Sequence, residues 1–96
     1  MEILVVYDVC TETAAGQRRL RKVAKVCEGF GQRVQKSVFE CVVNPAQLEQ
    51  LKHRLAKEIN VKEDSLRIYR LLEPREKYVQ SLGQSLSFDQ REPLVV

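Results

Sequence analysis

The stretch that decides the fold is Ile3-Leu4-Val5-Val6-Tyr7, which is followed by Asp8. Every residue in this stretch is apolar, and the isoleucine and valines are β-branched, which favours an extended strand. Apolar side chains on both faces are typical of a strand in the buried interior of a sheet. Residues 3–7 therefore predict a strand that needs a cover on each side of its sheet.

Beyond this strand, the chain alternates between helical and extended patterns. Residues 17–28 carry apolar side chains at i, i+3, i+4 and i+7, which predicts an amphipathic helix. Residues 32–43 alternate in polarity but are too long for one flat strand, so they predict two strands divided near Ser37. Asn44 is a good N-cap followed by proline and predicts the start of a second helix. Residues 66–72 alternate again and predict a further strand.

This order of elements predicts an α+β fold with the ferredoxin-like arrangement βαββαβ and an extra C-terminal strand. We expect one domain over residues 1–96, with a core at 1–72, a polar linker at 73–91 and a terminal strand at 92–96. Both helices then lie on one face of the sheet, which leaves the strand at residues 3–7 uncovered on the other. A second copy of the chain is the expected cover, so the pattern predicts a twofold homodimer.

Size and composition exclude several classes of protein. A chain of 96 residues is too short for a TIM barrel or a doubly wound nucleotide-binding enzyme. The three cysteines are odd in number and lack Cys-x-x-Cys spacing, so neither a disulfide framework nor a zinc site is indicated. No targeting segment or membrane-spanning stretch is visible, and we expect a reduced, cytoplasmic protein without a membrane partner.

Positive charge is concentrated in the first predicted helix. Residues 17–25 contain five cations and no anion, in a chain whose formal net charge is +3. Such a cluster is typical of a surface that binds the phosphates of nucleic acid, although a solvated helix face has the same pattern.

Asp8 is a candidate for chemistry because it ends the buried strand and begins the loop toward the first helix. Two such carboxylates, one from each copy of a twofold dimer, suffice for Mg²⁺, which keeps several waters and needs few protein ligands. The alternative is that Asp8 caps the following loop through its own backbone.

The chain also resembles a known family, the small CRISPR-associated Cas-two endonucleases. The resemblance covers residues 1–72 and is carried by Tyr7-Asp8-Val9, by Arg19 and Arg21 in the first helix, by Gly-Gln-Arg-Val-Gln-Lys-Ser-Val-Phe-Glu at 31–40, and by Arg67-Ile68-Tyr69. It implies a homodimer whose terminal strand, here residues 92–96, pairs with the partner's sheet. It also implies a Mg²⁺-dependent nuclease acting on single-stranded RNA or duplex DNA, which works beside the Cas-one integrase when new spacers are acquired.

The resemblance assigns roles to individual residues. The catalytic, metal-binding aspartate of the family corresponds to Asp8. The positions that face nucleic acid correspond to Arg19, Arg21, Arg33 and Phe39. Many members carry a second acidic residue near the position of Thr11, and its absence here weakens a metal site built from one chain alone.

Two functions from different classes stay open at this stage. In the first, the protein is an endonuclease in which Asp8 from each subunit holds Mg²⁺. In the second, the dimer is a non-catalytic scaffold that binds duplex DNA for the integrase, and Asp8 is structural. A stand-alone RNA-recognition motif is disfavoured because the RNP1 octapeptide is absent.

Overall fold

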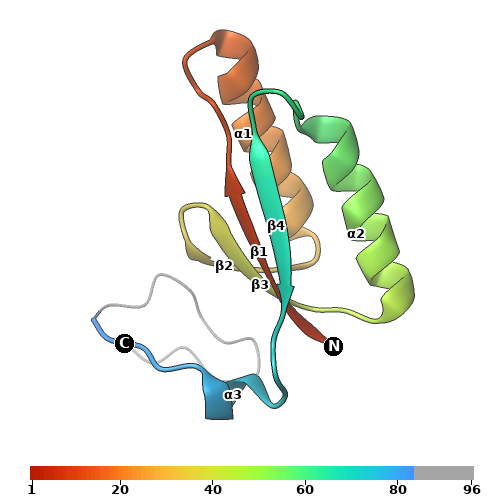
Figure 1. The fold of residues 1–96 in the computed structure, drawn as a ribbon, viewed down its shortest axis with the longest axis vertical. Helices are drawn as coiled ribbons and strands as arrows, with labels where there is room; N and C mark the ends of the chain where they lie inside the picture. The colour runs from red at the N-terminus through yellow and green to blue at the C-terminus, as the bar shows by residue number, and fades with distance from the viewer. Residues whose placement is uncertain (84–96) are drawn as a thin grey trace.

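Strand β1 (Glu2–Asp8) lies in the interior of a four-stranded sheet in the computed structural model, which describes residues 1–83 (Figure 1). It pairs with β3 (Val38–Val42) on one side and with β4 (Ser65–Arg70) on the other. β2 (Gly31–Gln35) pairs with β3, so the sheet order is β2-β3-β1-β4. All of these pairings are antiparallel, which confirms the predicted α+β class.

Helix α1 (Ala14–Glu28) begins three residues before the predicted helix because Thr13 caps it. The Thr13 hydroxyl accepts a hydrogen bond from the backbone N–H of Gly16 at 3.0 Å. Thr13 satisfies an N–H group that would otherwise lack a partner at the helix start. The predicted helix starts later than this because Leu20, the first residue of the apolar stripe, lies nearly two turns after Thr13.

Helix α2 (Pro45–Glu58) begins where the sequence predicts. The Asn44 side chain accepts from the backbone N–H of Gln47 at 2.7 Å, and the Gln47 side chain accepts from that of Asn44 at 2.9 Å. This reciprocal capping box fixes the first turn of the helix. The predicted division of residues 32–43 into two strands is also confirmed, since β2 and β3 are separated by a turn that includes Ser37.

The core lies between the sheet and the two long helices. Figure 1 shows α1 and α2 behind the sheet, and they contact each other. On this side of β1 the side chains of Ile3, Val5 and Tyr7 are buried. They pack with residues from both helices and from β3, of which the largest fully buried ones are Phe39, Leu51, Leu55, Val23 and Cys27.

We call the other side of the sheet the open face. It carries Leu4, Val6 and Asp8 of β1, together with the residues paired to them in register, which are Val38 and Glu40 of β3 and Ser65, Arg67 and Tyr69 of β4. Leu4 and Val6 are only half-buried there. The strand at residues 3–7 is therefore apolar on both faces, as predicted, and neither long helix covers the open face.

A short helix, α3 (Arg75–Tyr78), follows β4 inside the predicted linker 73–91. It is tied to the sheet by Arg75, whose backbone N–H donates to Glu2 at 2.8 Å and whose guanidinium pairs with Glu40 at 2.6 Å. The predicted terminal strand at 92–96 lies outside the described residues. Among residues 1–83, no helix has the length and apolar character needed to cross a bilayer.

Candidate active site and nucleic-acid interface

Asp8 is the last residue of β1 and is exposed on the open face. The alternation of β1 places it there, two residues beyond Val6, and its backbone is in register with Ser65 of β4. Within the residues that the structure describes, its carboxylate takes part in no hydrogen bond or ion pair. The alternative in which Asp8 caps its own loop therefore has no contact to support it.

One chain offers a divalent cation only a small part of a site. No group of three or more His, Cys, Asp or Glu residues suited to a metal occurs within residues 1–83. Mg²⁺ keeps several waters and is often held by one or two carboxylates, so an exposed and unpaired aspartate fits the ion when a second copy supplies the other carboxylate. One chain thus supplies, in Asp8, one carboxylate of the kind that Mg²⁺ binds.

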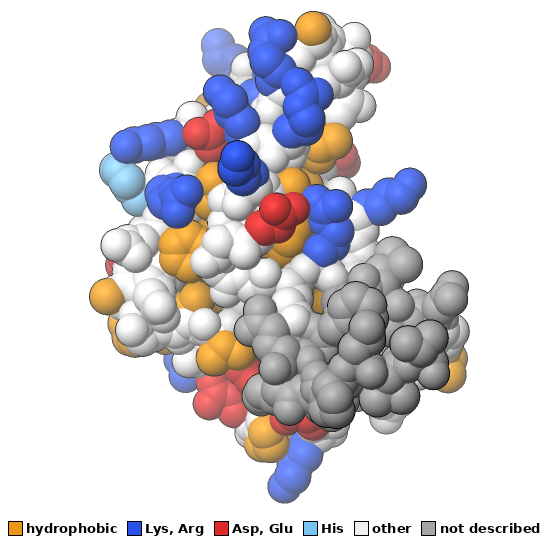
Figure 2. Space-filling model, turned by 180° about the vertical axis from the view of Figure 1, so that it is seen from behind, with side chains coloured by type: hydrophobic (Ala, Val, Ile, Leu, Met, Phe, Trp, Pro, Cys, Tyr) orange, Lys and Arg blue, Asp and Glu red, His pale blue; other side chains and the backbone are white. Residues whose placement is uncertain are grey.

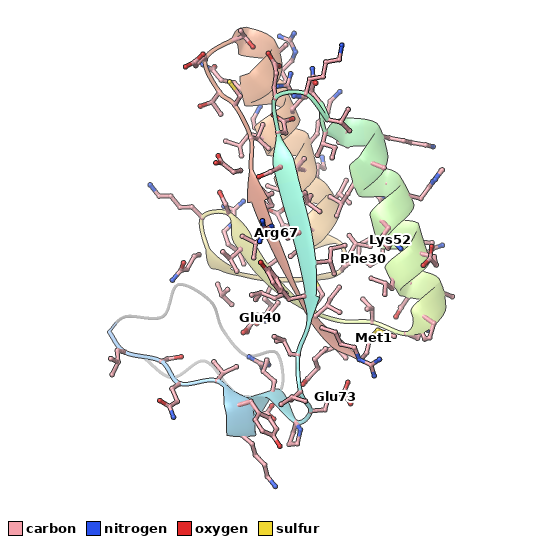
Figure 3. The ribbon with its side chains drawn as sticks, viewed as in Figure 1. Met1, Phe30, Glu40, Lys52, Arg67 and Glu73 are labelled. Atoms are coloured by element: carbon pink, nitrogen blue, oxygen red, sulfur yellow. The ribbon has the colours of Figure 1, made fainter. Side chains whose placement is uncertain are left out.

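Arg67 and Tyr69 also lie on the open face, in register with Val6 and Leu4, and Figure 3 labels Arg67 on β4. Arg67 is in register with Val6, and its guanidinium donates to the Tyr69 hydroxyl at 3.1 Å. This hydrogen bond raises the pKa of Arg67, so the side chain stays cationic. Sequence reasoning did not select either residue as part of a site. The alternation along β4 could have indicated that they share a face, because Arg67 and Tyr69 are two residues apart on the polar side of the strand.

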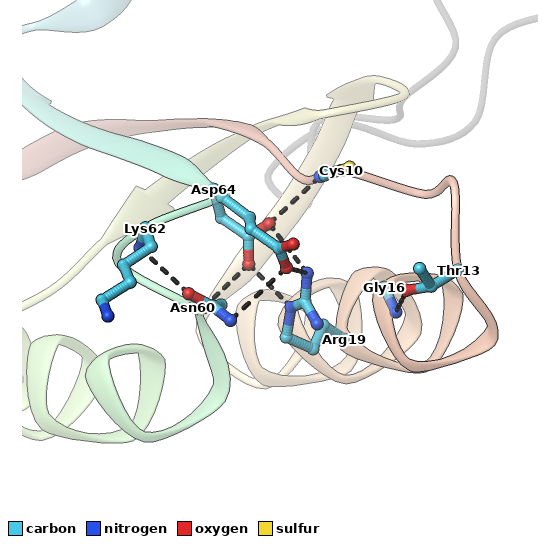
Figure 4. Close-up of polar contacts among 8 residues, drawn as sticks. Cys10, Thr13, Gly16, Arg19, Asn60, Lys62 and Asp64 are labelled. Carbon is cyan, nitrogen blue, oxygen red and sulfur yellow. Dashed lines mark hydrogen bonds and ion pairs between the residues drawn. The ribbon is translucent and has the colours of Figure 1, made fainter.

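Asp64, which directly precedes β4, forms the centre of a hydrogen-bonded group that we call the Asp64 cluster, made of Cys10, Arg19, Asn60 and Asp64 (Figure 4). Its Oδ1 atom accepts from the backbone N–H of Cys10 at 3.0 Å and from Nη2 of Arg19 at 3.2 Å. Its Oδ2 atom accepts from Nε of Arg19 at 2.8 Å and from the backbone N–H of Asn60 at 2.8 Å.

The environment of Asp64 strongly favours its ionised form. The side chain is 0 % exposed, and the hydrogen bond from Arg19 is the main reason why the pKa of Asp64 falls to about 2. The N–H groups of Asn60 and Cys10 act in the same direction. At neutral pH an ionised Asp64 carboxylate, paired with Arg19, therefore lies against the loop that follows Asp8.

Arg19 is placed differently from the expectation that it faces nucleic acid. It is paired with Asp64 at 2.8 Å and with Glu63 at 3.1 Å, and its side chain is only 17 % exposed. Contact with a phosphate would require these pairs to break, so this structure assigns Arg19 to the interior cluster. The helical spacing indicates this inward position, because Arg19 lies one turn before the buried Val23 and two turns before the buried Val26.

Phe39, which the resemblance assigns to the nucleic-acid interface, is buried in this chain. Phe39 is 0 % exposed and is in register with Val5 on the side of the sheet that the helices cover. A ring without exposed surface cannot stack directly on a base in this chain. It instead supports Arg33, whose guanidinium carbon lies 5.2 Å from the ring centroid.

Arg33 remains at the surface, with 45 % of its side chain exposed and Glu28 at 3.8 Å. Arg21 is also exposed, as the phosphate-facing role requires. Both residues lie on the helix side of the sheet, whereas Asp8 lies on the open face. The structure therefore does not bring the expected basic residues and Asp8 onto one surface of a single chain.

Arg21 belongs to a larger group on α1 that we call the cationic stripe, made of Arg18, Arg21, Lys22 and Lys25. Their spacing is i, i+3, i+4 and i+7, which places them on one helix face, and all are exposed. Within residues 1–83 none of them has an ion-pair partner. Figure 2 shows blue Lys and Arg side chains gathered over the upper part of the helix side. The stripe is a surface suited to a line of phosphates.

The thiols of Cys27 and Cys41 contribute no reactive group to these surfaces. All three cysteines are free, and Cys27 and Cys41 are buried in the core. Burial raises the pKa of Cys27 to about 12 and that of Cys41 to about 11, so both stay protonated at neutral pH.

Comparison with known proteins gives a consistent result. The family model described as CRISPR associated protein Cas2 matches residues 1–79. The CRISPR-associated endoribonuclease Cas2 1 of Moorella thermoacetica is 66 % identical over 96 residues, which is 100 % of both chains. The CRISPR-associated endonuclease Cas2 of Halalkalibacterium halodurans is 48 % identical over 95 residues, which is 99 % of both chains.

A solved structure shows the same fold. The crystal structure of Streptococcus pyogenes Cas2 at pH 6.5 matches with a TM-score of 0.80 and 54 % sequence identity, covering 86 % of this chain and 100 % of that one. The chain, with its exposed Asp8, its open sheet face and its cationic helix, belongs to the Cas2 family of CRISPR associated proteins.

Proposed function

We propose that this protein is a Mg²⁺-dependent endonuclease of CRISPR antiviral defence, which acts as a homodimer on phosphodiester bonds of RNA or duplex DNA. The observation that carries the proposal is the exposed, unpaired Asp8 carboxylate at the end of the buried central strand. Two relatives that match nearly the whole chain are named an endoribonuclease and an endonuclease. As the family resemblance implies, the dimer also takes part in spacer acquisition beside the Cas-one integrase.

The homodimer is supported by the open face. Leu4, Val6 and Val38 are half-buried on it, and α1 and α2 cover only the other face. A second sheet packed on these residues would remove them from water and bring two copies of Asp8 into one interface. The sheet order β2-β3-β1-β4 supports the ferredoxin-like arrangement that such a dimer uses.

In this function Asp8, Arg67 and the cationic stripe have separate roles. Asp8 from each copy would hold the ion, and Arg67, in register with Val6 on the same face, would offer a positive charge to a phosphate oxygen. Bound Mg²⁺ would polarise the phosphate and lower the pKa of the attacking water. Cations of the stripe hold the nucleic-acid backbone without reading its sequence.

A second function, that of a non-catalytic scaffold for duplex DNA, is favoured by one observation. The cationic stripe lies on α1, on the helix side of the sheet, while Asp8 lies on the open face. A duplex can therefore be held by the stripe at a distance from Asp8. In this function the dimer positions DNA for the integrase, and Asp8→Asn leaves the biological role intact.

The deciding experiment compares the wild type with Asp8→Asn on labelled RNA and labelled duplex DNA, in Mg²⁺ and in EDTA. The matched control is Glu12→Gln, which removes an exposed carboxylate from the same loop. The endonuclease proposal expects cleavage by the wild type and by the control, and none by Asp8→Asn. Wild-type binding of duplex without any Mg²⁺-dependent cleavage would establish the scaffold instead.

A further inference from the structure

We propose that Asp64 and Arg19 form a positioning clamp that fixes the loop after Asp8 and thereby sets the orientation of the Asp8 carboxylate. This inference rests on the proposed function, in which Asp8 holds the metal ion. It assigns to Arg19 a role that acts through Asp64 rather than through contact with nucleic acid.

The first argument is the saturation of the Asp64 carboxylate. Each of its oxygens accepts two hydrogen bonds, at distances from 2.8 to 3.2 Å, and together they bind the loop at Cys10, helix α1 at Arg19 and the segment after α2 at Asn60. A carboxylate has about four acceptor positions, so none is left over. Such an arrangement fixes the direction of each partner and not only its distance.

The second argument is the close approach of helix α1 to the carbonyl group of Cys10. A Cβ atom at Gly16 would overlap the carbonyl oxygen of Cys10, so the first turn of α1 lies directly against this peptide. The N–H of the same residue is held by Asp64. The backbone two residues after Asp8 is therefore hydrogen-bonded at its N–H and closely packed against helix α1 at its carbonyl.

The third argument is the position of Asp64 next to the strand partner of Asp8. Ser65 follows Asp64 in the chain and is in register with Asp8. The clamp thus holds β4 at the point where it pairs with Asp8, and it holds the loop where the chain leaves Asp8. Asp8 itself is exposed and has no side-chain partner in residues 1–83, so its orientation depends on this backbone support.

The clamp needs both the carboxylate and the guanidinium. The Nε and Nη2 atoms of Arg19 contact different oxygens of Asp64, a geometry that a lysine ammonium cannot reproduce. A lysine would, however, keep a simple contact to phosphate, because it carries the same charge. Arg19→Lys therefore separates a positioning role from a phosphate-binding role.

The test compares the wild type with Asp64→Asn, Arg19→Lys and the control Glu63→Gln, which changes the half-exposed carboxylate that accepts from Arg19 and from the Asn60 side chain but leaves Asp64 in place. Cleavage of a labelled RNA and a labelled duplex gives kcat and KM at saturating Mg²⁺, and NMR gives amide hydrogen exchange for residues 8–12 without metal. We expect Asp64→Asn and Arg19→Lys to lower kcat about 10²-fold with KM nearly unchanged, as a misplaced catalytic group does. The Cys10 amide should exchange faster in both, and Glu63→Gln should match the wild type.

Each contrary result has a defined meaning. Folded Asp64→Asn with wild-type kcat and wild-type exchange at Cys10 would overturn the clamp. Arg19→Lys with unchanged kcat and exchange would overturn the part assigned to Arg19, and this variant also decides the matter if Asp64→Asn fails to fold. If the wild type shows no Mg²⁺-dependent cleavage, the proposed function fails, and exchange at Cys10 alone then supports or overturns the clamp.

Discussion

Replacing Asp64 by asparagine keeps the shape of the side chain but removes half of its acceptor positions. The amide oxygen can still accept two hydrogen bonds, but the amide nitrogen cannot accept those that the second carboxylate oxygen accepts now. Whichever way the amide turns, one N–H of Arg19 and one backbone N–H, from Cys10 or Asn60, lose their acceptor. We expect the variant to fold but to be less stable at neutral pH.

The magnitude follows from the titration of Asp64. Its pKa is lowered from the ordinary value of 3.8 to about 2 in the folded chain. Since one pKa unit corresponds to about 1.4 kcal/mol, the ionised carboxylate contributes about 2 kcal/mol to the free energy of unfolding at neutral pH. Because the folded pKa is the lower one, this contribution is complete above pH 4 and is lost as the pH falls through about 2.

The assay is urea unfolding followed by far-ultraviolet circular dichroism, because the chain has no tryptophan. Wild type and Asp64→Asn are compared from pH 7 to pH 2 at one fixed protein concentration, since the stability of the proposed dimer would depend on concentration. The difference in free energy of unfolding should shrink by about 2 kcal/mol over this range. Glu63→Gln serves as the control and should show no such change. A difference that stays constant between pH 5 and pH 2 would refute the assignment of a buried, ionised Asp64.

Four further outcomes are expected. Asp8→Asn should keep the fold and lower Mg²⁺-dependent cleavage to the level seen in EDTA; full activity in nuclease-free protein would show that Asp8 is no ligand. Changing all residues of the cationic stripe to alanine should flatten the salt dependence of duplex binding by about 0.9 in log K against log salt for each lost phosphate contact, measured by fluorescence anisotropy; an unchanged slope would mean that the stripe is only solvated. Light scattering should show the wild type as the proposed dimer and Val6→Lys as a monomer, because the lysine places a charge on the open face; a dimer of Val6→Lys would rule out that face as the interface. Phe39→Ala should lower the free energy of unfolding by about 3–5 kcal/mol in urea titrations, whereas a stable variant with lost nucleic-acid binding would restore Phe39 to the binding surface.

The elements of this fold could be predicted from the sequence because their signals are local. Asn44 and Gln47 form a capping box within one turn of helix, and the structure contains it. The division near Ser37 follows from the length of an alternating stretch, and β2 and β3 meet there. The start of α1 was predicted too late because the cap at Thr13 stands before the apolar stripe.

The candidate site was less predictable because it depends on register and on distant contacts. Val38 and Phe39 are adjacent apolar residues, and only the pairing with β1 decides that Phe39 faces the helices. Asp64 is one of 13 acidic residues in the sequence. Its partners Cys10 and Arg19 lie 54 and 45 positions away in the chain, so no local pattern could select it.

The same long separations have a kinetic consequence. Both long helices and the β2–β3 hairpin are built from near neighbours in the chain, whereas the hydrogen bonds of Asp64 to Cys10 and Arg19 close loops of 54 and 45 residues. Closing long loops is slow, and interactions that form after the folding transition state act mainly on the rate of unfolding. We expect Asp64→Asn to accelerate unfolding in stopped-flow experiments while the refolding rate stays nearly constant. The cluster beneath the Asp8 loop would then determine how long a folded molecule lasts and have little influence on how quickly it forms.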